Sequence, residues 1–168
     1  MSSDHQVLLK RLLRISPNTP LHDDDVLGTF IKLPTWLMAL DDYPSPYYDL
    51  VDHLFIHTKI LETLGHLNDV RKLTVGEVLE AMKLGELMRM ISEHQSIRPE
   101  KLTADRSLED DLGITGDDFD ELMVYLVEEL GLTFDLNTIH LYRGPEAMFA
   151  RSYKTTDLRI RDLLRWMP

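Results

Sequence analysis

The sequence predicts an all-α fold, and three observations lead to this prediction. Apolar residues recur at the three- and four-residue spacing of amphipathic helices. Capping residues, prolines and glycines stand where those stretches begin and end. Segments that lie far apart in the chain also resemble each other at nearly equal offsets. We therefore expect two degenerate helical domains in tandem, residues 1–84 and residues 85–168.

The internal repeat depends on two alignments. The aligned segments are 15–24 (ISPNTPLHDD) with 102–111 (LTADRSLEDD), and 72–82 (KLTVGEVLEAM) with 157–167 (DLRIRDLLRWM). The first alignment pairs Leu21 with Leu108, and the second pairs Leu73 with Leu158. Few residues are identical, so the copies are degenerate, but two nearly equal offsets favour a duplication.

In the first half, the apolar pattern predicts helices over residues 6–14, 34–40 and 47–64, and a further helix that begins after Thr74. Glu77 stands three residues after Thr74, which is the spacing of a capping box. We expect the boundary between the two halves at Gly85, although the apolar pattern continues through this residue and a continuous helix is the alternative.

In the second half, one helix is strongly indicated from residue 116 onward. Its apolar residues share one face of the predicted helix and are Phe119, Leu122, Met123, Leu126, Val127 and Leu130. We expect Thr115 and Asp118 to cap its start and Gly131 to end it. Shorter helices are expected over residues 145–153 and 156–166. Residues 135–142 fit either a short extended piece or a helical turn.

The other face of the helix that begins near residue 116 is acidic. Its candidate partner-binding residues are Asp117, Asp118, Glu121, Glu128 and Glu129. Because they project from the side opposite the apolar residues, a basic partner helix could dock on them. The alternative is that they are ordinary solvated surface carboxylates.

The run PEKLTADRSLEDDLG, followed by DEL and VEELG, resembles the acyl carrier protein pattern. The resemblance covers the second half and is most specific over residues 97–132. It implies a four-helix bundle whose acidic second helix is recognised by partner enzymes. The family attaches 4′-phosphopantetheine to a serine, and the ungapped alignment places that serine on Gly116, which has no hydroxyl. The chain is therefore more similar to bacterial acyl-carrier-like proteins that carry G-D-D at this point, and no cofactor is expected.

The overall composition favours a protein partner with a basic surface. The chain has 168 residues, 43% of them hydrophobic, and a formal net charge of −11. This charge repels nucleic acids and anionic membrane surfaces. The chain contains no cysteine, which excludes disulfides and cysteine-based metal sites. Without a signal-like start or an apolar stretch of membrane-spanning length, we expect a cytoplasmic protein.

Candidate catalytic or metal-binding chemistry is sparse. Asp49, His53 and His57 have a helical spacing that allows one zinc ion to be held, but the sequence HLFIH lacks the glutamate of a zinc protease helix. We therefore expect no metal site here. The chain also lacks a G-x-S-x-G motif and a phosphate-cradling glycine loop, so we expect no enzymatic activity.

The sequence thus favours a non-catalytic, acyl-carrier-like interaction or regulatory protein. Two alternatives stay open. The protein could be a true acyl carrier modified at another hydroxyl, such as that of Thr115. It could also be an acidic immunity or antitoxin-like protein whose charge neutralises a cationic toxin.

Overall fold

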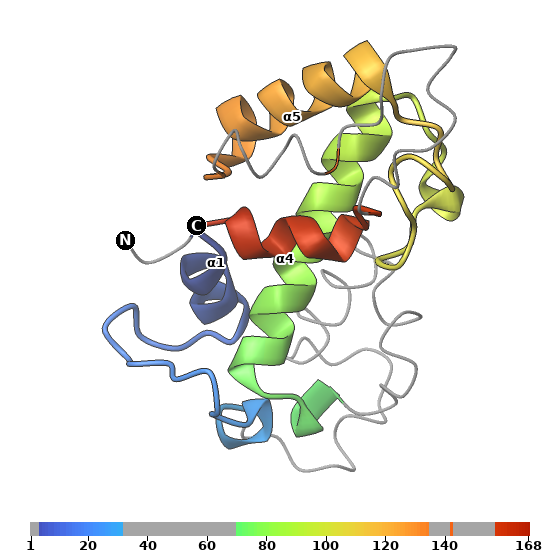
Figure 1. The fold of residues 1–168 in the computed structure, drawn as a ribbon. Helices are drawn as coiled ribbons and strands as arrows, with labels where there is room; N and C mark the ends of the chain where they lie inside the picture. The colour runs from blue at the N-terminus through green and yellow to red at the C-terminus, as the bar shows by residue number, and fades with distance from the viewer. Residues whose placement is uncertain (1–3, 32–69, 135–141, 143–156) are drawn as a thin grey trace. The chain divides into compact units, whose positions relative to one another are not determined.

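The computed structural model describes residues 4–31, 70–134, 142 and 157–168 (Figure 1). Its elements are α1 (Asp4–Leu12), η1 (Leu27–Thr29), η3 (Val70–Lys72), α4 (Val75–His94), η4 (Pro99–Lys101), α5 (Gly116–Leu130) and η5 (Ile160–Trp166), where η marks a 3-10 helix. Among these residues there is no strand, only two isolated bridges, so the all-α class is confirmed for them. The helices expected at 34–40, 47–64 and 145–153 lie outside the described residues.

Internal contacts divide the chain into two compact units, Met1–Glu86 and Leu87–Pro168. The boundary predicted from the sequence lies after residue 84. The division falls inside α4, a helix of 20 residues that continues through the buried Gly85. Gly85 is therefore not a break between helices, and the alternative of a continuous helix is correct.

Helix α4 begins with the expected capping box. The backbone amide of Thr74 donates to Glu77 Oε2 over 2.8 Å, and the amide of Glu77 donates to Thr74 Oγ1 over 3.2 Å. Two amides that have no partner inside the helix are thereby satisfied, which typically contributes about 1 kcal/mol to stability.

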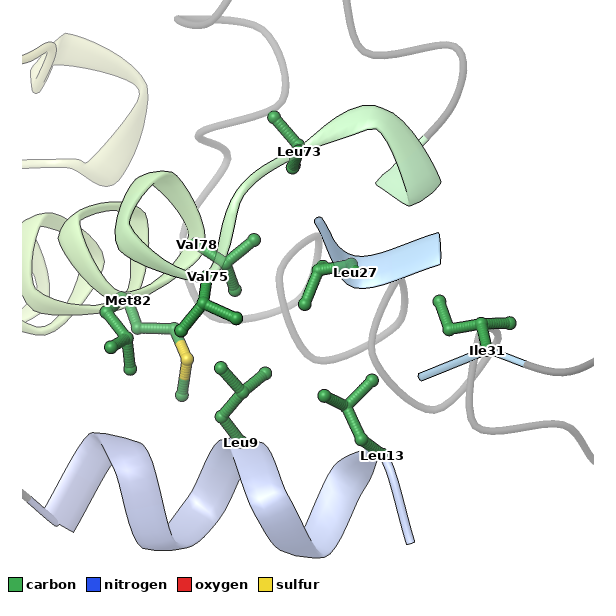
Figure 2. Packing of buried hydrophobic residues seen from close by; sticks show 9 residues of the cluster. Leu9, Leu13, Leu27, Ile31, Leu73, Val75, Val78 and Met82 are labelled. Atoms are coloured by element: carbon green, nitrogen blue, oxygen red, sulfur yellow. The ribbon is translucent and has the colours of Figure 1, made fainter. Parts of the chain in front are cut away.

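The core of the first unit forms where α1 faces the first turns of α4 (Figure 2). Leu9 and Leu13 point from α1 and its end toward Val75, Val78 and Met82, and all five are at most 3% exposed. The remaining buried members are Leu27, Ile31, Leu73 and Leu79. The helix expected over residues 6–14 is thus present as α1, shifted toward the N-terminus by two residues at each end.

Both α5 and η5 contribute fully buried side chains to the second unit. Leu122 and Leu126 of α5 and Ile160 and Leu163 of η5 are each 0% exposed, and Leu108 of the preceding loop is 1% exposed. The C-terminal helix expected over residues 156–166 is therefore realised as the 3-10 helix Ile160–Trp166.

The same backbone hydrogen bonds recur in the two units. The amide of Leu27 donates to the carbonyl of Leu73 over 2.8 Å, and the amide of Leu108 donates to that of Leu158 over 2.9 Å. Two further pairs repeat this relation. The amide of Val75 donates to the carbonyl of Asp25, and in the second unit the amide of Ile160 donates to the carbonyl of Arg106. Likewise, the amide of Gly76 donates to the carbonyl of Asp23, and the amide of Arg161 donates to the carbonyl of Ala104. In each unit a loop and the start of a late helix are therefore joined by the same three bonds.

The ends of α1 and α4 also match. Arg14 and Ser96 are the non-glycine residues with positive φ in the described chain, at 54° and 53°. The next residue donates its amide back to the helix in both cases, from Ile15 to Lys10 and from Ile97 to Ser92, each over 3.1 Å. A left-handed residue after the last turn is a common way to end a helix.

The backbone hydrogen bonds support one of the two sequence alignments and shift the register of the other. Leu73 and Leu158 occupy equivalent positions, as the second alignment states. Leu108, however, corresponds to Leu27 and not to Leu21. Side-chain identity in DD-rich loops is a weak guide to register, because exposed acidic residues are exchanged with little effect on packing.

Candidate interaction surface on helix α5

Helix α5 forms because its sequence combines an apolar stripe with a stop signal. Phe119, Leu122, Met123 and Leu126 are buried. At its C-terminal end Gly131 adopts a left-handed φ of 66°, and its amide donates to the carbonyl of Val127. The expected end of the helix at Gly131 is therefore confirmed, and the buried stripe fixes which side of α5 faces solvent.

The start of α5 differs from the expectation in one respect. Thr115 is the N-cap residue by position, but its side chain makes no capping hydrogen bond. The expected capping box between Thr115 and Asp118 is therefore wrong. The next residue, Gly116, has a φ of +55°. A side-chain cap requires helical geometry in the first turn, and a left-handed first residue does not supply it.

The backbone conformation, and not a lack of space, accounts for a glycine at position 116. A Cβ built at this position would have no neighbour within 4 Å, but the positive φ disfavours any residue with a side chain. The position at which acyl carrier proteins have a serine is therefore open toward solvent, yet its backbone conformation favours glycine.

The five expected partner-binding residues are all exposed. We call them the acidic face, and they are Asp117, Asp118, Glu121, Glu128 and Glu129. Separations of three, four and seven residues return to nearly the same side of a helix, so Asp117, Glu121 and Glu128 follow one line along α5. Within the described part of the chain no side chain of the acidic face makes an ion pair or hydrogen bond.

Two exposed apolar residues that the sequence pattern does not assign to the acidic face accompany it. Val124 is 57% exposed, and Val127, which was expected in the buried stripe, is 37% exposed. Val124 lies three residues after Glu121 and four before Glu128, so it shares their line. The expectation for Val127 is therefore wrong, because periodicity identifies the centre of a buried face but not how far its cover extends.

Contacts from the end of α4 hold α5 in place within the second unit. The rings of His94 and Tyr125 stack with centroids 4.4 Å apart and an angle of 27° between planes. Gln95 Nε2 donates to the backbone carbonyl of Asp118 over 3.3 Å. These contacts reach one flank of α5 and leave the line of Asp117, Glu121 and Glu128 uncovered by them.

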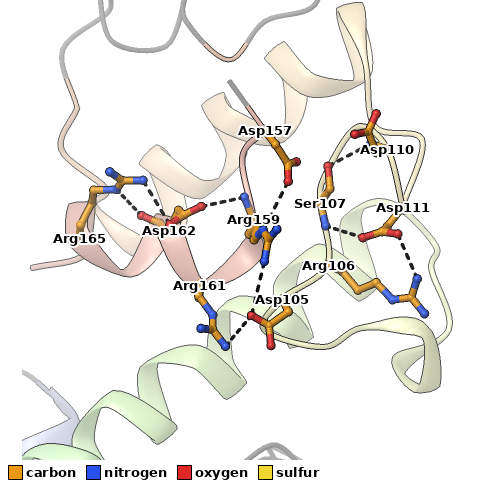
Figure 3. A network of polar contacts seen from close by, with 10 residues as sticks. All are labelled: Asp105, Arg106, Ser107, Asp110, Asp111, Asp157, Arg159, Arg161, Asp162 and Arg165. Carbon is orange, nitrogen blue, oxygen red and sulfur yellow. Dashed lines mark hydrogen bonds and ion pairs between the residues drawn. The ribbon is translucent and has the colours of Figure 1, made fainter. Parts of the chain in front are cut away.

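Elsewhere in the second unit, four aspartates, Asp105, Asp111, Asp157 and Asp162, are paired with arginines (Figure 3). Asp105 Oδ1 lies 2.6 Å from Arg161 Nη2 and 3.9 Å from Arg159 Nη1. Further pairs are Arg159 with Asp157, Arg165 with Asp162, and Arg106 with Asp111. Each exposed pair contributes little to stability, but together they neutralise this region. The acidic face has no such neutralisation among the described residues.

Asp111 illustrates how this loop stabilises negative charge. The backbone amide of Ser107 donates to Asp111 Oδ2 over 2.9 Å, and this hydrogen bond is the main reason that the pKa of Asp111 lies below its ordinary value of 3.8. Arg106, 3.2 Å away, lowers the pKa further. The loop before α5 is thus fixed by a carboxylate that stays ionised.

Asp49, His53 and His57, which were weighed as zinc ligands, lie outside the described residues. Among the residues that are described, no group of three or more histidine, aspartate or glutamate side chains has a geometry that could hold a metal ion.

No protein-family model, curated protein or solved structure matches this chain. The resemblance to acyl carrier proteins stays a hypothesis carried by residues 97–132. Within the described ranges, no helix combines the length and the apolar content needed to cross a membrane.

Proposed function

We propose that this chain is a non-catalytic interaction or regulatory protein that presents the acidic face of α5 to a protein partner with a basic surface. Its plan is acyl-carrier-like and lacks a phosphopantetheine arm. The observation that carries the proposal is the contrast within the second unit. Carboxylates near η5 are paired with arginines, whereas those of the acidic face make no ion pair within the described residues. Unpaired charges of one sign on a rigid helix attract a partner of opposite sign.

Three features support an acyl-carrier-like plan without the arm. The acidic helix, which the resemblance implies, follows a loop fixed by backbone hydrogen bonds. Gly116 occupies the position of the modified serine and provides no hydroxyl. Its positive φ also favours glycine over serine.

We further infer that the two units are degenerate copies of one plan. The recurring hydrogen bonds support this, because unrelated segments would not be expected to share three loop-to-helix bonds and the same helix ending. On this basis α4 combines two elements. Its first part corresponds to η5 of the second copy, and its last part corresponds to α1 of the first.

The partner can be found by affinity purification of the tagged chain from its native cell, with mass spectrometry of the captured proteins and of the chain itself. The association rate of the captured partner is then measured with the variant Asp118→Lys/Glu121→Lys. The control, Asp24→Lys/Glu80→Lys, alters exposed carboxylates of the first unit by the same total charge. We expect the α5 variant to slow association about tenfold at low salt and the control to have a much smaller effect. An equal rate for both variants refutes the proposal.

A second candidate, an acyl carrier modified at Thr115, is kept because of one observation. Thr115 is exposed, and its hydroxyl makes no capping hydrogen bond. Incubation with a phosphopantetheinyl transferase and coenzyme A distinguishes the two functions by intact mass. We expect no mass gain in the natural chain. A gain that disappears in Thr115→Val would establish the carrier function and exclude the first proposal.

A further inference from the structure

The two halves of α5 differ in how their charges are compensated. Asp117 and Asp118 lie in the first turn, where the positive end of the helix dipole stabilises carboxylates. Glu128 and Glu129 lie near the opposite end, where the dipole is negative, and the last turn contains no basic residue. Although both halves of α5 carry exposed carboxylates, the electrostatic potential is therefore more negative at the C-terminal half.

The exposed apolar residues of α5 belong to the same half. Val124 is 57% exposed and Val127 is 37% exposed, whereas the buried Phe119 is the one apolar side chain of the first turn and a half. Apolar contact supplies most of the free energy in protein interfaces, while charges mainly set association rate and orientation. A partner that contacts the C-terminal half can use both.

We propose that the partner docks on the C-terminal half of α5, on a patch formed by Val124, Val127, Glu128 and Glu129. This inference rests on the proposed function. The occupant is a basic amphipathic helix that carries lysine or arginine along one side of an apolar stripe, because Glu128 and Glu129 both lie on the same side of the two valines. Its cations meet Glu128, Glu129 and the negative end of α5, and its apolar residues cover the two valines. Charge complementarity fits a helix laid along α5, because Val124, Val127 and Glu128 lie within about 100° of rotation on α5 and Glu129 flanks them beyond Glu128.

The test uses a fluorescent synthetic helical peptide made of leucine and lysine, and a matched peptide in which glutamine replaces leucine. Peptide affinity is measured by fluorescence anisotropy at low salt for the full chain and two charge variants. They are Glu128→Lys/Glu129→Lys and Asp117→Lys/Asp118→Lys. Both variants change the net charge equally, so nonspecific attraction affects them alike.

We expect the Glu128→Lys/Glu129→Lys variant to weaken binding of the leucine–lysine peptide about tenfold, and the Asp117→Lys/Asp118→Lys variant by about threefold or less. Val124→Gln should weaken it about threefold, and should have no effect on the glutamine-containing peptide. The Glu128→Lys/Glu129→Lys change removes an unfavourable charge arrangement, so its loss of binding cannot be assigned to unfolding of the helix.

Equal weakening by both charge variants, or a stronger effect of Asp117→Lys/Asp118→Lys, overturns the C-terminal patch and leaves the proposed function standing. An unchanged affinity in both variants overturns the proposed function as well, because the acidic face would then not bind the basic peptide. Insensitivity of the leucine–lysine peptide to Val124→Gln removes the apolar part of the inference.

Discussion

Reversing the charge of Glu129 should make the protein more stable, which is unusual for a substitution in a residue assigned to function. Glu129 lies next to Leu130, the last residue of α5, and no basic side chain occupies that turn. A charge at a helix end changes stability by about 0.3–1 kcal/mol at low ionic strength. Glu129→Lys replaces an unfavourable charge by a favourable one, so we expect a gain of about 1 kcal/mol in the free energy of unfolding.

Two features make this substitution a clean measure of the helix-end effect. Glutamate and lysine have similar helix propensities. Within the described residues the Glu129 side chain makes no ion pair or hydrogen bond that the change would break. The matched control is Asp117→Lys, which places a cation at the positive end of α5 and should lower the free energy of unfolding by about 0.5 kcal/mol.

Urea unfolding followed by far-ultraviolet circular dichroism measures both changes. In about 1 M salt the screening length falls to about 3 Å, so both effects should shrink to less than half. A Glu129→Lys variant that is less stable than the natural chain at low salt, or a gain that salt leaves unchanged, would refute the reasoning. It would also remove the electrostatic argument for the C-terminal docking patch.

Three further predictions concern the folded framework. Leu27→Ala and Leu108→Ala should each lower the free energy of unfolding by about 3 kcal/mol, because both side chains are at most 1% exposed; a cost below about 1 kcal/mol at either position would contradict equivalent core roles. Gly131→Ala should cost about 1 kcal/mol in urea unfolding, since its φ of 66° disfavours a side chain although a Cβ would meet nothing within 4 Å; no cost would mean that the helix ends differently. Because the pKa of Asp111 is lowered in the folded state, its carboxylate stabilises the fold above about pH 3.8, and this contribution is lost as the pH falls through the folded-state pKa. Acidification from about pH 5 to about pH 3 should therefore cost Asp111→Asn less stability than the natural chain, and equal losses would count against the Ser107 hydrogen bond as the cause.

The sequence predicted α5 well because a helix of fifteen residues with one apolar stripe and a terminal glycine satisfies several local rules together. It failed at two points on the same helix. The side-chain cap expected at Thr115 does not form, because Gly116 has a left-handed φ of 55° that the local sequence pattern does not reveal. Val127 was assigned to the buried stripe, but the extent of burial depends on what packs against the helix.

The repeat shows a similar division. Buried positions such as Leu73 and Leu158 could be paired from sequence, because the need to fill a core restricts their character. The correspondence of Leu27 with Leu108 required the backbone hydrogen bonds. Loops tolerate insertions and exchanges of polar residues, so their register leaves a weak trace in the sequence.

By itself the sequence determined the helical class, the acidity of one side of α5 and the absence of a hydroxyl at Gly116, because these follow from side-chain identity and local spacing. Only the tertiary structure decided which carboxylates are neutralised. Folding brings Arg159 and Arg161 of the C-terminal segment to Asp105, more than fifty residues earlier, and brings no arginine to the acidic face within the described residues. Charge pairing over such sequence distances depends on how the helices pack, and local pattern contains no record of it.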